Sequence, residues 1–234
     1  MSKQSKHDTA RETFPRLWER VHDKHAEEIA DTERRLNVGY IDGDNPARDD
    51  KDLYIERHAT ARRWEQYQAG EITRDQIIRY TLNRYIKQRD KELAADLAKL
   101  ERRAEVSAPE RIDISIEWTR GGVYGMQARA RVYAGHTYTG ELTGGCGYNK
   151  ISTAAASALN RSPEVMRVLC HLWEARAAVG LGMPVGVIGT ALPSIGGGYG
   201  MSTITNILSL AGYTLTNSAQ GRYYDYFSYE EVTA

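Results

Sequence analysis

The sequence has few cysteines and no long apolar run. Its only two cysteines, Cys146 and Cys170, are not in a C-x-x-C pair. This argues against a disulfide framework or a zinc site, so we expect two reduced thiols and no metal. The absence of 18 consecutive apolar residues argues against a membrane span, and the first residues lack the apolar stretch of a secretory signal. We therefore predict a cytoplasmic protein that does not bind membranes.

The sequence also lacks net charge, because 31 basic residues balance 31 acidic ones. Any nucleic-acid binding would therefore need a local basic patch. Residues 1–108 carry 22 charges of each sign, and residues 109–234 carry 9 of each. A segment so rich in charge cannot bury much of itself, whereas the charge-poor part can close a core. We predict two regions that meet near Pro109: a charged helical N-terminal region, 1–108, and a glycine-rich α+β domain, 109–234.

Apolar residues at helical spacing predict three helices in the N-terminal region. The first covers residues 8–36, and the second covers 53–68 and is ended by Gly70. Thr73 and Gln76 form a capping-box pattern, which predicts the start of a long helix over 73–105.

Within this long helix, residues 74–91 contain more basic than acidic side chains. Two interpretations stay open: a solvated face with salt bridges, or a surface that follows the phosphates of DNA or RNA. The residues that would make the nucleic-acid contact are Arg79, Arg84, Lys87, Arg89 and Lys91.

After Pro109 the pattern changes to alternation with a period of two, which is typical of half-buried strands. We predict strands over 112–119, 126–133 and 137–143, then a helix over 150–159 with a narrow alanine stripe. Ser162 and Pro163 mark the start of a further helix, and a short helix over 202–210 precedes strands at 213–217 and 222–229. The order β-β-β-α-α-loop-α-β-β predicts an α+β fold with an antiparallel sheet.

Two glycine-rich turns, 144–149 and 196–200, precede predicted helices, where free backbone N–H groups favour anions. Neither has the order of a Walker loop or of a dinucleotide-binding turn. We favour a role for these glycines in tight turns, with a nucleotide-binding enzyme as an alternative. Cys146 near a helix start is a candidate nucleophile without a local signature. No complete catalytic motif is present, so we predict a non-enzymatic protein, without catalytic residues or cofactor.

Tyrosine is abundant, with 15 residues against 2 phenylalanines. Tyrosine and arginine together are typical of recognition surfaces, because they anchor protein interfaces and stack on bases. A protein interface, a nucleic-acid interface and ordinary cross-strand pairing all stay open. The candidate partner-binding residues are Arg120, Tyr124, Arg129, Arg131, Tyr133, Tyr148, Lys150, Tyr199, Arg222 and Tyr224.

The stretch G-G-C-G-Y-N-K-I-S at 144–152, followed by L-S-L-A-G-Y at 208–213, resembles a group of small proteins encoded by phages and mobile elements of gut bacteria. The resemblance covers roughly residues 112–229 and implies no catalytic residues. Its setting is similar to that of proteins that inhibit host antiphage defences such as CRISPR-Cas. The resemblance implies an accessory protein in the cytoplasm of a bacterial host. Its partner would be a host protein or nucleoprotein such as a CRISPR effector, with direct DNA or RNA binding as the alternative.

Overall fold

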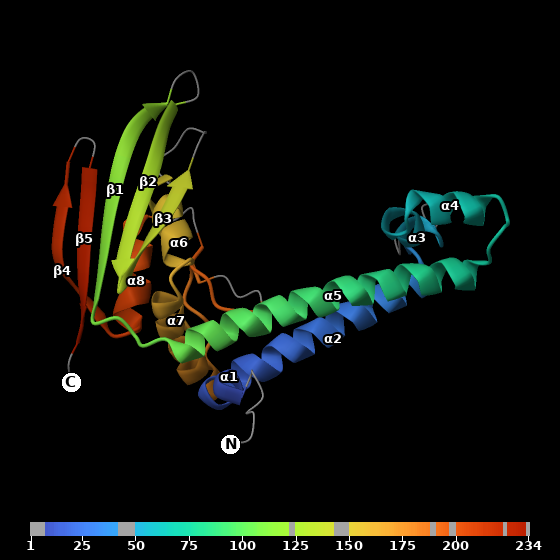
Figure 1. Ribbon diagram of the computed structural model, residues 1–234, viewed down its shortest axis with the longest axis horizontal. Helices are drawn as coiled ribbons and strands as arrows, with labels where there is room; N and C mark the ends of the chain where they lie inside the picture. Colours follow the sequence, from blue (N-terminus) through green and yellow to red (C-terminus); the bar gives the residue numbers. More distant parts are fainter. Residues whose placement is uncertain are drawn as a thin grey trace. The chain divides into compact units, whose positions relative to one another are not determined.

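The structure is a computed structural model that describes residues 8–41, 50–121, 125–142, 150–187, 191–196, 200–221 and 224–232. It confirms the predicted α+β class and the predicted order of strands and helices after Pro109 (Figure 1). The chain divides into two compact units: unit 1 comprises the described residues up to Trp18 and from Leu97 onward, and unit 2 comprises Glu19–Asp96. Residues 8–18 and 97–108 thus pack with the C-terminal domain, although the sequence prediction assigned them to the N-terminal region.

Unit 1 is built on a five-stranded antiparallel sheet with strand order β3-β2-β1-β5-β4 (Figure 1). The strands are β1 Arg111–Gly121, β2 Gly125–Ala134, β3 His136–Leu142, β4 Tyr213–Gln220 and β5 Tyr224–Glu231. Alternation places Ile112, Ile114 and Ile116 on one face, where all three are fully buried. The predicted strands are confirmed within the described residues; β4 ends three residues later than predicted and β5 two residues later. Positions 143, 222 and 223 of the predicted strands lie outside the described residues.

Three helices belong to the C-terminal part of unit 1: α6 Lys150–Leu159, α7 Pro163–Ala178 and α8 Met201–Leu210. The alanines of α6 allow it to lie close on β2 and β3, and α8 packs on β4. As predicted, Ser162 is the N-cap of α7: its hydroxyl accepts a hydrogen bond from the Val165 amide at 3.2 Å, and Pro163 follows it.

The predicted helix over 8–36 is interrupted, so the chain forms α1 Asp8–Thr13 and α2 Pro15–Val38. Pro15 has no N–H with which to continue the ladder of α1, which explains the break at Phe14. Phe14 is buried, with its ring centroid 4.9 Å from that of His171 in α7. The Leu17 amide donates to the Glu174 carboxylate at 2.8 Å. These contacts hold residues 8–18 against α7.

Unit 2 contains α3 Leu53–His58, α4 Ala61–Gln68 and the first part of α5 Arg74–Glu105. The predicted helix over 53–68 is divided, because the Thr60 hydroxyl caps a new helix by accepting from the Arg63 amide at 3.4 Å. The predicted capping box is confirmed: the Thr73 amide donates to Gln76 at 2.8 Å, and the Gln76 amide donates to Thr73 at 3.3 Å.

The core of unit 2 is small and consists of Leu36, Ile55, Ile77 and Ile78, with Trp64 packed beside them. Within the described ranges, no helix combines the length and apolar character that crossing a membrane requires.

Candidate interaction surfaces

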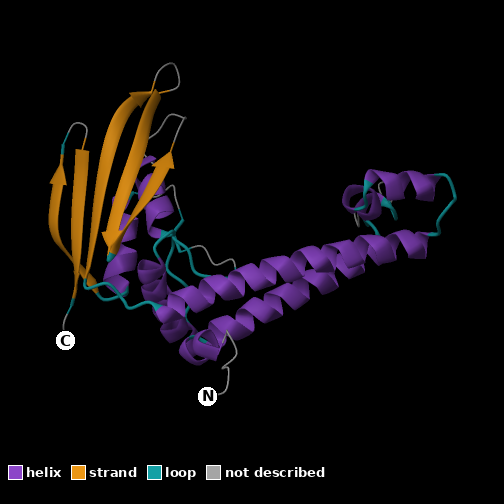
Figure 2. Cartoon of the chain, in the orientation of Figure 1, coloured by secondary structure: helices purple, strands orange, loops and turns teal. Residues whose placement is uncertain are grey.

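One face of the unit 1 sheet lies opposite the face on which α6 and α8 pack (Figure 2). Among the described residues of unit 1, no helix packs on this face, which we call the outer sheet face. Its charged and aromatic members are Arg111, Asp113, Glu117, Arg129, Arg131, Tyr133, Glu141, Tyr224, Tyr226 and Glu230.

Cross-strand ion pairs hold the central arginines of the outer sheet face. Arg129 Nε lies 2.7 Å from Oε1 of Glu141, its direct neighbour on β3. Arg131 Nη1 lies 3.5 Å from Oε1 of Glu117 on β1. All four side chains are about half exposed, so each pair contributes little to stability, about 0 to 1 kcal/mol. The pairs nevertheless place a carboxylate beside each arginine, so these two arginines add no local cationic excess.

A second polar network lies where β1 meets β5. The Tyr226 hydroxyl donates to Asp113 Oδ1 at 2.7 Å, and Arg111 donates both to the same oxygen at 3.0 Å and to the Tyr226 hydroxyl at 3.1 Å. Partial burial opposes ionisation of Asp113, but these donors outweigh it, and the pKa of Asp113 lies below its ordinary value. Asp113 is therefore ionised at neutral pH.

Two tyrosines of the outer sheet face are open to solvent: Tyr133 is 55% exposed and Tyr224 is 45% exposed. Of the charged residues that define this face, three are arginines and four are carboxylates. A face without cationic excess suits a protein surface of mixed charge better than a chain of phosphates.

Of the predicted partner-binding residues, the structure brings together Arg129, Arg131, Tyr133 and Tyr224 on this face. For Arg120 in β1 and Lys150 in α6 only the backbone is described. The others lie outside the described residues: Tyr124, Tyr148, Tyr199 and Arg222. Cys146 and most of both glycine-rich turns also lie outside them, so the nucleotide-binding alternative stays a prediction.

The five predicted nucleic-acid contacts on α5 differ in their surroundings. Arg79, Arg84, Lys87 and Lys91 are exposed, and Arg84 Nη2 donates to the His58 carbonyl at 2.7 Å. Arg89 is instead only partly exposed and is ion-paired with Glu28 and, at 2.6 Å, with Glu92. The prediction therefore fits four of the five residues by exposure, and Arg89 has a structural role within unit 2.

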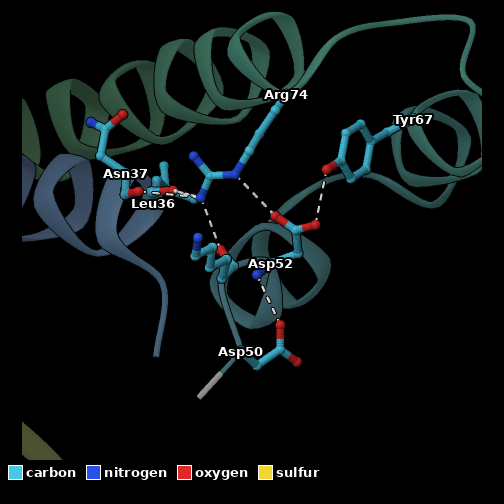
Figure 3. Close-up of polar contacts among 7 residues, drawn as sticks. Leu36, Asn37, Asp50, Asp52, Tyr67 and Arg74 are labelled. Carbon is cyan, nitrogen blue, oxygen red and sulfur yellow. Dashed lines mark hydrogen bonds and ion pairs between the residues drawn. The ribbon is translucent and has the colours of Figure 1, made fainter. Parts of the chain in front are cut away.

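A cluster in unit 2 that was not predicted from the sequence is centred on Arg74 (Figure 3). Arg74 Nε donates to Asp52 at 3.1 Å, and the Tyr67 hydroxyl donates to the other carboxylate oxygen at 2.9 Å. The hydrogen bond to Asp52 raises the pKa of Tyr67. Nη2 of Arg74 also donates to the backbone carbonyls of Leu36, Asn37 and Lys51. This cluster ties the end of α2 to α3, α4 and α5, which is a structural task.

Glu164 is the centre of a further cluster, in unit 1. Its buried carboxylate accepts from Tyr138 at 2.9 Å and Ser162 at 2.8 Å, and lies 3.0 Å from Nδ1 of the exposed His136. Burial alone would raise the pKa of Glu164, but hydrogen bonds outweigh it and the pKa is lowered. Burial and the hydrogen bond to Glu164 raise the pKa of Tyr138 to about 12.

The described part of the chain contains no group of three or more His, Cys, Asp or Glu side chains placed to hold a metal ion. Cys170 is fully buried, 3.6 Å from Arg103 Nη1, and burial raises the pKa of its thiol. A buried protonated thiol is a poor nucleophile.

Comparison with protein-family models, with curated proteins and with solved structures finds no match. The resemblance of residues 112–229 to phage and mobile-element proteins therefore stays a prediction.

Proposed function

We propose that this protein is a non-enzymatic binding protein and that its outer sheet face contacts a protein partner. The observation that carries the proposal is the pairing of Arg129 and Arg131 with glutamates on neighbouring strands, beside the exposed Tyr133 and Tyr224. Contact with a phosphate chain depends on free cations, and each of these arginines has a carboxylate beside it.

The chemistry of this face defines the partner that fits it. We propose a folded protein whose surface carries both charge signs, because carboxylates and guanidinium groups alternate on the outer sheet face. Tyrosine contributes large contact area at a low cost in side-chain entropy. The ion pairs and the Asp113 network already restrict the neighbouring side chains, so less freedom is lost on binding.

In its specific form, the proposal is that the partner belongs to a host defence nucleoprotein, such as a CRISPR effector, and is inhibited. This part is supported by the resemblance of residues 112–229 alone. The test is a nucleic-acid cleavage assay with a purified effector. Undiminished cleavage, together with no complex on a sizing column, would contradict this specific partner. The general proposal is tested separately by the next experiment.

The general proposal is tested by identifying a protein that crosslinks to a probe at position 133 or 224, purifying it, and measuring its affinity. The variant Tyr133→Ala with Tyr224→Ala is expected to weaken binding at least tenfold, because exposed aromatic anchors carry much of the energy of an interface.

The matched control is Tyr40→Ala, which removes a tyrosine of unit 2 that is 37% exposed and belongs to neither proposed surface. It should leave this affinity unchanged. Equal affinity of the sheet variant and the unmodified protein, or equal loss in the control, would contradict the proposal.

A further inference from the structure

The exposed side of α5 in unit 2 carries cations that no described carboxylate neutralises. Arg79, Arg84, Lys87 and Lys91 are exposed and form no ion pair with a described residue. At about 100° and 1.5 Å per residue, the four positions fall within an arc of about 140° and along about 18 Å of the helix. They therefore form a continuous stripe, which we call the α5 stripe.

The turn between α3 and α4 extends this stripe. The hydrogen bond from Arg84 to the His58 carbonyl places its guanidinium at the turn, and the exposed Arg57 is the chain neighbour of His58. At the start of α4, Arg63 lies over the ring of Tyr80, with its guanidinium carbon 4.0 Å from the ring centroid. A flat arginine-tyrosine pair thus lies beside the cations.

The acidic side chains of the same stretch do not cancel this charge. Arg74 and Arg89 already have carboxylate partners outside the stripe, namely Asp52 and Glu28. Residues 74–91 otherwise contain two carboxylates, Asp75 in the first turn and Asp90, which lies 3.5 Å from the His25 ring. Four cations against two carboxylates leave the stripe positive, in contrast to the outer sheet face.

We propose that the α5 stripe binds the phosphate backbone of a nucleic acid. Lysine and arginine aligned along a helix neutralise successive phosphates and release counterions. The guanidinium of Arg63, stacked on Tyr80, offers a platform on which an unpaired base can stack. This binding is independent of the protein interface proposed for the sheet, since it uses other residues in the other unit.

The test is fluorescence anisotropy of the full chain with labelled single-stranded and duplex oligonucleotides over a series of salt concentrations. The variant Lys87→Gln with Lys91→Gln is compared with Arg129→Gln plus Arg131→Gln, which removes the same charge from the outer sheet face. The first is expected to weaken binding at least tenfold near 0.1 M salt and to reduce the slope of log affinity against log salt by about 2. The variant Arg129→Gln plus Arg131→Gln should change neither the affinity nor the slope of log affinity against log salt.

Two further arms define the ligand. Tyr80→Leu should weaken binding to the single strand more than to the duplex, because only unpaired bases can stack. An equal loss of affinity for both forms would contradict a stacking role. Absent binding, a salt-independent affinity, or equal losses in both double variants overturns the proposal. Poly-glutamate that displaces the oligonucleotide as well as unlabelled RNA does would identify an acidic polypeptide as the ligand, and would also overturn it.

Discussion

At the scale of single residues, Gly140 sets how closely α6 approaches the sheet. A Cβ atom at this position would lie 2.5 Å from the Ala158 nitrogen and still nearer to the Ala154 carbonyl oxygen. Backbone atoms of a helix cannot yield as the end of a flexible side chain can. The close packing of α6 on β3 therefore requires both the small alanine side chains of α6 and the absence of a side chain at Gly140.

Gly140→Ala is expected to destabilise the protein by about 1 to 3 kcal/mol or more, because the helix must move away from the sheet. Urea unfolding with the midpoint and slope fitted together measures this change. Gly182→Ala is the matched control: nothing lies within 4 Å of its Cβ position, so its effect should stay within about 0.5 kcal/mol. An equal effect of the two substitutions would show that helix-sheet contact is not the cause.

Glu164 links stability to pH. Because its pKa is lowered in the folded protein, the stabilisation is present above the pKa of the unfolded chain, near 4.5, and is lost as pH falls through the folded value. Glu164→Gln should therefore have its largest effect near neutral pH, and the stability curves of variant and unmodified protein should converge as the pH falls from 4.5 through the lowered folded pKa. Thermal unfolding between pH 2 and 7 measures this; a constant difference across that range contradicts the assignment.

At the scale of elements, Arg74 joins α5 to the end of α2 and to the start of α3 and, through Asp52, to α4. Arg74→Lys keeps the charge but cannot reproduce a planar group that reaches Asp52 and three carbonyls together. We expect a loss of about 1 to 3 kcal/mol from unit 2. Hydrogen exchange of the α2, α3 and α4 amides measures it, with Arg79→Lys, an exposed neighbour without an ion pair, as the control. Unchanged hydrogen-exchange protection in Arg74→Lys would show that the hydrogen bond between Asp52 and Tyr67 holds these helices together without the guanidinium of Arg74.

Local patterns predicted most elements because their causes lie within a few residues. Alternating isoleucines predicted β1, and the Thr73 and Ser162 caps predicted the starts of α5 and α7. The breaks at Phe14 and at Ala59 were missed because apolar spacing continues through both, although Pro15 and Thr60 carry the signal that interrupts each helix.

The sites were harder to predict, because they depend on register and on distant segments. Exposure of Arg129 and Arg131 follows from alternation, but their partners follow only from the pairing of β2 with β1 and β3. Arg74 was grouped with the other cations of its helix, and no local pattern marks it as the residue that reaches Asp52. Likewise, nothing near Phe14 indicates that its neighbour is His171.

At the scale of the whole molecule, the two units offer separate spectroscopic reporters. Trp64 is the only one of the four tryptophans that lies in unit 2. In a background where Trp18, Trp118 and Trp173 are phenylalanine, its fluorescence should report the unfolding of unit 2 alone. We expect Gly140→Ala to leave this transition in place while it lowers the midpoint of unit 1, which is followed in a second background where Trp118 of β1 is the only tryptophan. Coincident shifts of both signals would show that the units unfold as one.

Residues 8–18 join unit 1 through contacts with residues that lie far along the chain. The acceptor of the Leu17 amide is Glu174 in α7, 157 residues later. At about 5 to 20 residues per second, the ribosome needs about 8 to 30 s to deliver it. During that interval Phe14 lacks its ring contact with His171 and the Leu17 amide lacks its acceptor, whereas the core of the contiguous Glu19–Asp96 segment needs no later residue. Residues 8–18 are thus made before Glu19–Asp96 but reach their native place after it, and until α7 emerges the nascent chain exposes apolar side chains that chaperones can bind.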